Sequence, residues 1–112
     1  MKSLNQVSPA GNYRDVVFNA SDWVDAYVST GAARTFTKTT DYPAEAEVVV
    51  FSATGNFYVN FAGGTAAAPA AHVTDGTGSV LNPTSRYVRG MSSFSVFAPA
   101  GTIVTMAFYT VQ

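Results

Sequence analysis

Few residues of this chain have the types and spacing that catalysis requires. His72 is the only histidine, and Asp75 follows it within the same polar stretch. A histidine oriented by an aspartate can act as the base of a nucleophilic catalyst. Such a site also needs a serine or cysteine nucleophile, typically on a sharp turn between a strand and a helix. The chain has no cysteine, and no serine in that setting. We therefore interpret His72 as a surface-loop residue and expect no catalytic residues and no enzymatic activity.

The acidic residues do not form a convincing metal site or acid–base pair. Asp75-Gly76-Thr77-Gly78 is similar to part of a calcium loop, but calcium takes roughly six to eight oxygen ligands and one carboxylate stands alone here. Glu45 and Glu47 would share one face of a strand, as paired catalytic carboxylates do. Two glutamates at a strand entrance are more often simply solvated. Gly63-Gly64-Thr65 lacks the lysine of a phosphate loop. We expect no metal, no cofactor and no small-molecule substrate.

Aromatic and basic side chains suit binding better than catalysis. Arg86, Tyr87 and Arg89 lie on one predicted strand, and arginine and tyrosine are frequent in protein interfaces; a plain solvated strand is the alternative. Exposed tyrosines could also stack on sugars, although tyrosines on a sheet more often form cross-strand pairs. The candidate interface residues are Arg86, Tyr87, Arg89, Tyr58, Pro69 and His72, and the candidate sugar-stacking residues are Tyr58, Tyr87, Tyr109, Tyr13 and Tyr42.

The C-terminal run from Ser93 to Tyr109 must position much of this chain, and its pattern predicts a β-hairpin. Pro99 suits the first position of a turn, and Gly101 can adopt the left-handed conformation that closes it. A three-residue loop would pair Val96 with Val104 and Phe94 with Met106 on one face. Because both faces are apolar, the pair is expected inside a sandwich.

A second hairpin is predicted from 46–53 and 57–61, with Thr54-Gly55-Asn56 between the two arms. A three-residue loop would pair Val49 with Phe61 and Phe51 with Val59. A two-residue loop would shift these pairs by one, and the sequence leaves the register open.

The remaining segments are short strands separated by turns. Residues 1–12 read as a polar N-terminal arm, 13–19 as a strand, and 23–29 as a strand or a single helical turn; we favour a strand, with Trp23 in the core. The Thr-rich stretch 34–40 suits an edge strand, and 62–79 forms a long loop of small residues. The sequence thus predicts an all-β fold: one jelly-roll-like β-sandwich over 13–112, built mostly from antiparallel hairpins.

The composition favours burial against partners. Hydrophobic residues make up 47% of the 112 residues and charged residues only 12%, about half the usual share. The net charge of −1 and the lack of a basic run argue against nucleic-acid binding. No apolar run has the ~20 residues of a membrane span, and the N-terminus lacks the apolar core of a signal peptide.

Roughly residues 46–110 resemble small proteins encoded among the virion structural genes of tailed bacteriophages and prophages. The resemblance rests on these segments: 52–59, Pro69, 74–76, 81–83, Arg86-Tyr87, 94–96 and 103–109. It implies a capsid-associated or decoration-type β-sandwich in many copies, made in the host cytoplasm and located in the virion. Its partners would be copies of itself and other virion proteins, the major capsid protein above all. The alternative is a carbohydrate-binding module that uses surface tyrosines.

Overall fold

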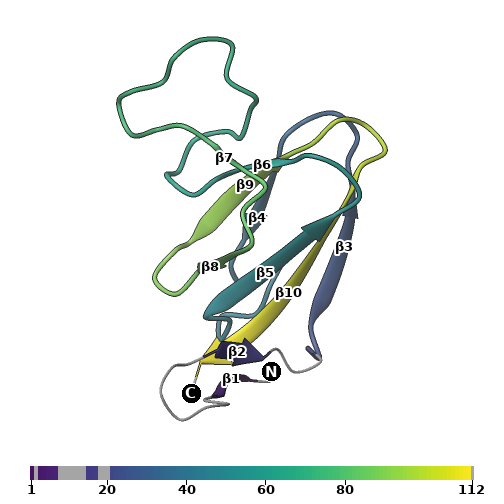
Figure 1. Ribbon diagram of the computed structural model, residues 1–112, viewed down its shortest axis with the longest axis vertical. Coiled ribbons are helices and arrows are strands. Elements are labelled where there is room, and N and C mark those ends of the chain that lie inside the picture. Colours follow the sequence, from purple (N-terminus) through teal and green to yellow (C-terminus); the bar gives the residue numbers. More distant parts are fainter. Residues whose placement is uncertain (2, 8–14, 18–20, 112) are drawn as a thin grey trace.

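A computed structural model describes residues 1, 3–7, 15–17 and 21–111, and its strands form two sheets packed face to face (Figure 1). The described residues contain no helix, and hence none that could cross a membrane. The strands are β1 (Ser3–Val7), β2 (Asp15–Val17), β3 (Val24–Val28), β4 (Arg34–Thr37), β5 (Val48–Ala53), β6 (Tyr58–Asn60), β7 (Val80–Leu81), β8 (Ser85–Tyr87), β9 (Ser93–Phe97) and β10 (Ile103–Val111).

The strand order is that of a jelly roll. One sheet contains the order β3-β10-β5-β8, extended by β1 and β2, and the other has the order β4-β9-β6-β7. Four antiparallel pairs are nested in the sequence: β3 with β10, β4 with β9, β5 with β8, and β6 with β7. This long folded ribbon rolls over, which brings β10 beside β5 and β9 beside β6. The prediction of an all-β, mainly antiparallel, jelly-roll-like sandwich is confirmed.

The C-terminal turn lies where it was predicted, but its two arms do not pair. Gly101 has a φ of 87°, and the Thr102 N–H donates to the Pro99 carbonyl at 3.1 Å. However, β9 pairs with β4 and β6, whereas β10 pairs with β3 and β5. The predicted pairs Val96–Val104 and Phe94–Met106 are therefore wrong. A strand has only two edges, and β9 and most of β10 already have a partner on each. The turn instead carries the chain from one sheet to the other.

The second predicted hairpin is wrong for the same reason. In the structure Phe51 pairs with Met106, and Val59 pairs with Val96. The predicted pairs Phe51–Val59 and Val49–Phe61 do not form, because β5 belongs to one sheet and β6 to the other. Residues 54–57 thus make a second crossing between the sheets.

Aromatic rings from both sheets fill the space between them. The rings of Tyr42 and Phe108 stack with centroids 5.0 Å apart, and those of Phe36 and Phe94 stack at 5.6 Å. All four side chains are buried, and each belongs to the core cluster. Trp23, in contrast, is 42% exposed, so its predicted place in the core is wrong. It precedes β3, where its carbonyl accepts a hydrogen bond from the Phe108 N–H at 3.0 Å, and its side chain lines an open pocket instead of being covered.

Tyr42 is buried without a partner for its hydroxyl group. The residue is 1% exposed, and its Oη makes no hydrogen bond. Burial, together with the nearby Asp41 carboxylate, raises the pKa of Tyr42 above its usual value. Because an unpaired buried hydroxyl has lost its hydration, we expect Tyr42→Phe to raise the free energy of unfolding by about 1–3 kcal/mol. Urea unfolding measures this change. Tyr87→Phe, at an exposed position, is the control and should change stability little.

Asn60 organises the long loop 61–79, which stands away from the sandwich in Figure 1. Its buried side-chain oxygen accepts hydrogen bonds from the N–H groups of Ala62 at 2.9 Å and Gly64 at 3.3 Å. Its amide group donates to the Thr77 carbonyl at 2.9 Å. One side chain thus ties together both ends of the loop.

Replacing Asn60 by alanine should loosen this loop. The change removes the hydrogen bonds of the Asn60 side chain to three backbone groups, all of them partly buried, so we expect a loss of about 1–3 kcal/mol in the free energy of unfolding. Limited proteolysis should then cut within 61–79 faster than in the parent chain. Thr65→Ala, at an exposed position of the same loop, serves as the control. Equal cleavage rates for parent and Asn60→Ala would show that the loop is held in another way.

Candidate assembly interface

Among the described side chains of β3, β5, β8 and β10 in the larger sheet, none that points outward is charged. In β10, Val104, Met106 and Phe108 are fully buried and point toward the other sheet, so the alternating residues point outward. The pairing registers extend this alternation to the neighbouring strands. We define the outer face by these outward residues: Val24, Ala26, Val28, Val48, Val50, Ser52, Ser85, Tyr87, Ile103, Thr105, Ala107 and Tyr109.

Much of this outer face is open to solvent. Val28 and Tyr87 are each 58% exposed, Val24 is 53% exposed and Ile103 is 37% exposed. Single exposed apolar residues are ordinary, but a group of them across one sheet without an interspersed charge marks an interaction surface. The outer face is therefore the strongest candidate for a docking surface among the described residues.

The two lateral edges of the same sheet are protected by charges. Asp25 on β3 pairs with the buried Met106, and Arg86 on β8 pairs with the buried Val49, so both charged residues point inward. The Arg86 guanidinium lies 5.6 Å from the ring centroid of Phe61. Inward-pointing charges on edge strands discourage pairing with another sheet. These charges thus oppose the addition of a further strand at the edges of the sheet, whereas no charged side chain of the outer face opposes a contact there.

Charged groups border the outer face at one end. Arg89 Nη1 lies 3.2 Å from Glu47 Oε2, and the Arg89 guanidinium lies 5.3 Å from the ring centroid of Tyr87. Glu47 Oε1 also accepts a hydrogen bond from the Val111 N–H at 3.1 Å. This arrangement holds the end of β8 against the end of β10, and it places the charges on the rim of the apolar surface, as in typical interfaces.

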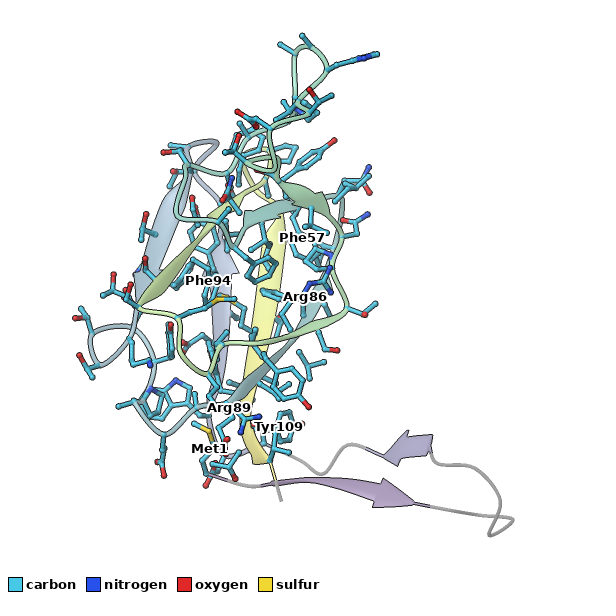
Figure 2. All side chains as sticks on the ribbon, turned by 90° about the vertical axis from the view of Figure 1, so that its left-hand side faces the viewer. Met1, Phe57, Arg86, Arg89, Phe94 and Tyr109 are labelled. Atoms are coloured by element: carbon cyan, nitrogen blue, oxygen red, sulfur yellow. The ribbon has the colours of Figure 1, made fainter. Side chains whose placement is uncertain are left out.

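The β1–β2 hairpin leaves the sandwich and extends to one side of it (Figure 2). β1 joins the larger sheet through two register positions, Ser3 with Thr110 and Leu4 with Val111, in parallel orientation. β2 pairs with β1. A two-stranded hairpin alone is marginally stable in water. This projecting segment would therefore be stabilised by a further surface that covers it.

The six predicted interface residues do not share one patch. Tyr87 lies on the outer face with Arg89 beside it on the rim, while Arg86 points to the inner side of the sheet. Tyr58 lies on β6 in the other sheet and is half-buried. Pro69 and His72 are exposed in the loop 61–79.

The residues considered for chemistry are dispersed or engaged in structural contacts. Asp75 Oδ1 accepts hydrogen bonds from the hydroxyl group and the N–H of Thr77, which lower the pKa of Asp75. His72 makes no hydrogen bond or ion pair with the described residues. Glu47 is held by Arg89, whereas Glu45 is exposed. Within the described part of the chain, no three histidine or acidic residues converge as metal ligands would.

The outer face could not be predicted from the sequence, because no single motif marks it. Its residues come from four strands, and the strand order brings them side by side only in the folded chain. The signal in the sequence is an apolar pattern on both sides of β5 and β10, which a strand buried on both faces within one protein would also show. Comparisons with protein-family models, with curated proteins and with solved structures found no match.

Proposed function

We propose that this chain is a non-enzymatic virion structural protein, a capsid decoration or capsid-associated subunit of a tailed bacteriophage or prophage. It assembles with copies of itself through the outer face, and the β1–β2 hairpin contacts a neighbouring virion protein, the major capsid protein above all. The observation that carries this proposal is the uncharged outer face between two charge-protected edges. A protein selected to stay monomeric would place charges on that surface.

The absence of charge on the outer face favours a second copy of the chain as its occupant. In a two-fold symmetric contact the same patch meets itself, so any charge near the axis would face a like charge. The outer face has none, and its exposed valine, isoleucine and alanine side chains can pack against their own copies. The charged rim at Glu47 and Arg89 then remains in contact with water.

The tyrosines give less support to the alternative of a sugar-stacking surface. Tyr42 and Tyr109 are buried, at 1% and 4% exposure, and Tyr58 is half-buried. Tyr87 is the one largely exposed tyrosine among the described residues, and Tyr13 lies outside them. The described residues thus form no row of several exposed tyrosine rings, which an extended glycan would need.

Co-sedimentation with capsids tests the proposed partner. The full chain should sediment with capsids of the phage or prophage that encodes it. A variant that lacks residues 1–20 should keep a cooperative thermal unfolding transition but lose most of this binding. A full chain that stays in the supernatant at every capsid concentration would contradict the proposed partner. Undiminished binding by the truncated chain would contradict the proposed role of the hairpin.

A further inference from the structure

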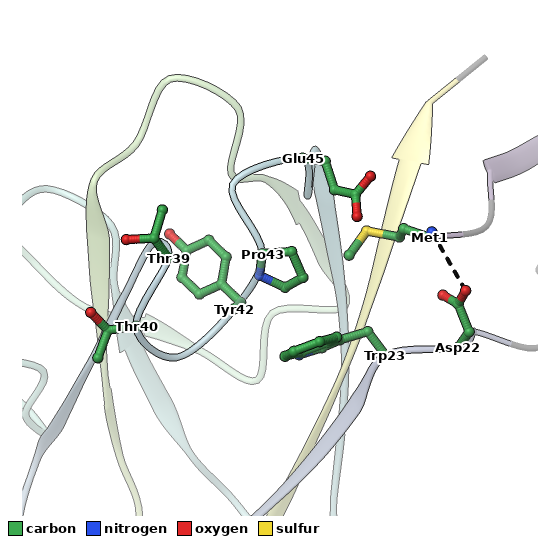
Figure 3. Close-up of a pocket in the computed structure, with 8 residues that line it drawn as sticks. All are labelled: Met1, Asp22, Trp23, Thr39, Thr40, Tyr42, Pro43 and Glu45. Atoms are coloured by element: carbon green, nitrogen blue, oxygen red, sulfur yellow. Dashed lines mark ion pairs between the residues drawn. The ribbon is translucent and has the colours of Figure 1, made fainter.

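A pocket of about 240 Å³ opens at the end of the sandwich where the N-terminus lies (Figure 3). The side chain of Trp23 forms one wall, opposite Tyr42 and Pro43. The polar part of the lining consists of Thr39, Thr40 and Glu45, together with Asp22, whose Oδ2 lies 3.4 Å from the Met1 amino group. The pocket is separate from the outer face, since none of its lining residues belongs to that surface.

Apart from the ion-paired Met1 and Asp22, the polar side chains around this pocket lack partners in the described part of the chain. The structure gives no hydrogen bond to Trp23 Nε1 or to the side-chain hydroxyl groups of Thr39 and Thr40. The Glu45 carboxylate forms no ion pair there either. Polar side chains elsewhere, such as Asn60, are extensively hydrogen-bonded. The pocket therefore offers free donors and acceptors beside an exposed indole ring.

Backbone strain occurs in the same wall. Thr39 has a φ of 72°, in the left-handed region that a β-branched residue rarely adopts. Its N–H donates to the Tyr42 carbonyl at 2.7 Å, which holds the tight turn closed. Such strain is concentrated at ligand-binding sites in proteins. Together with the unengaged polar groups, it indicates a wall shaped for a ligand.

The chemistry of the lining favours a sugar ring over a cation. A pyranose has an apolar C–H face that can lie on an indole ring, and a rim of hydroxyl groups that both donate and accept hydrogen bonds. Trp23 Nε1 is a donor, Glu45 is an acceptor, and the threonine hydroxyls are both. A cationic ligand could use the ring and the carboxylate, but it would leave the donors unpaired. The volume lies below the ~300 Å³ of sites for larger ligands, which suits a single ring.

We propose that the pocket between Trp23 and Pro43 binds one pyranose unit of a glycan, with its C–H face on the indole ring and its hydroxyl groups on Thr40 and Glu45. A ligand of about 12 non-hydrogen atoms at ordinary ligand efficiency should bind with a Kd of about 1–10 mM. This site is independent of the assembly role proposed above, and either can fail without the other.

Tryptophan fluorescence provides a direct test, since Trp23 is the only tryptophan of the chain. The full chain would be titrated with methyl α-D-glucopyranoside, methyl α-D-mannopyranoside, methyl β-D-galactopyranoside and N-acetyl-D-glucosamine. We expect a saturable change in emission with at least one of them. Amide chemical shifts measured by NMR during the same titration should change around residues 39–45.

Variants separate this site from general surface binding. Trp23→Ala, followed by NMR, should weaken binding at least tenfold, and Thr40→Ala should weaken it severalfold. Tyr87→Ala removes another exposed ring, on the outer face, and should leave binding unchanged. All three variants should retain the parent's cooperative unfolding. No saturable response to any of the four sugars would overturn the proposal. So would binding that survives Trp23→Ala, or a response to choline in place of the sugars.

Discussion

Replacing Phe94 by alanine should lower the free energy of unfolding by about 3–5 kcal/mol, the largest loss that we expect from a single substitution in this chain. Phe94 is 1% exposed and lies where the two sheets meet. Its ring lies 5.6 Å from those of Phe36 and Tyr42, and 6.1 Å from those of Phe51 and Phe61, measured between centroids. Rings from both sheets would thus border the cavity. Urea-induced unfolding, monitored by circular dichroism, measures the loss.

Phe97→Ala is the matched control for this prediction. Phe97 lies on the same strand, β9, but it is only partly buried and is not part of the core cluster. Its replacement should therefore cost clearly less than that of Phe94. Equal losses for the two variants would mean that the ring cluster around Phe94 is not the centre of the fold.

Ala107→Glu should disrupt self-association. Ala107 lies within the outer face, between Val24 on β3 and Val50 on β5. In the free chain the new carboxylate projects into water, so folding should change little. In a face-to-face contact between copies it would be buried without a partner, which costs several kcal/mol and weakens association by about 100-fold or more. Sedimentation equilibrium of parent and variant at matched concentrations measures the difference.

Thr35→Glu introduces the same charge elsewhere. Thr35 is exposed on β4, the edge strand of the other sheet. This variant should associate as the parent does, because its charge lies outside the outer face. If both variants weaken association to the same extent, net charge rather than the outer face controls the contact. If Ala107→Glu associates as strongly as the parent, the outer face is not the contact between copies.

The sequence predicted the turns and the buried residues better than the pairing of strands. Pro99 and Gly101 do reverse the chain, and Phe94 and Val104 are buried as expected. However, proline and glycine specify only that the chain turns. Whether the two arms share hydrogen bonds or lie in opposite sheets depends on competing strands from distant parts of the chain. Here β10 takes β3 as a partner, far away in the sequence.

Side-chain orientation was predictable only where one face of a strand is clearly polar. Around Trp23 both alternating sets of residues contain apolar members, so the periodicity does not indicate which set faces the core. In the structure Tyr27 points inward, whereas Val24 and Val28 point to solvent. The same ambiguity prevents the outer face from being predicted from the sequence. An apolar residue at an interface between molecules has the same sequence pattern as one in a core.

Sedimentation velocity of the purified full chain shows directly whether copies of this protein associate, as the uncharged outer face requires. We expect a species of at least twice the 11.8 kDa chain mass, which dissociates on dilution. It should persist in salt of about 1 M, because charge screening does not weaken an apolar contact. A single species of 11.8 kDa at every accessible concentration would contradict the claim.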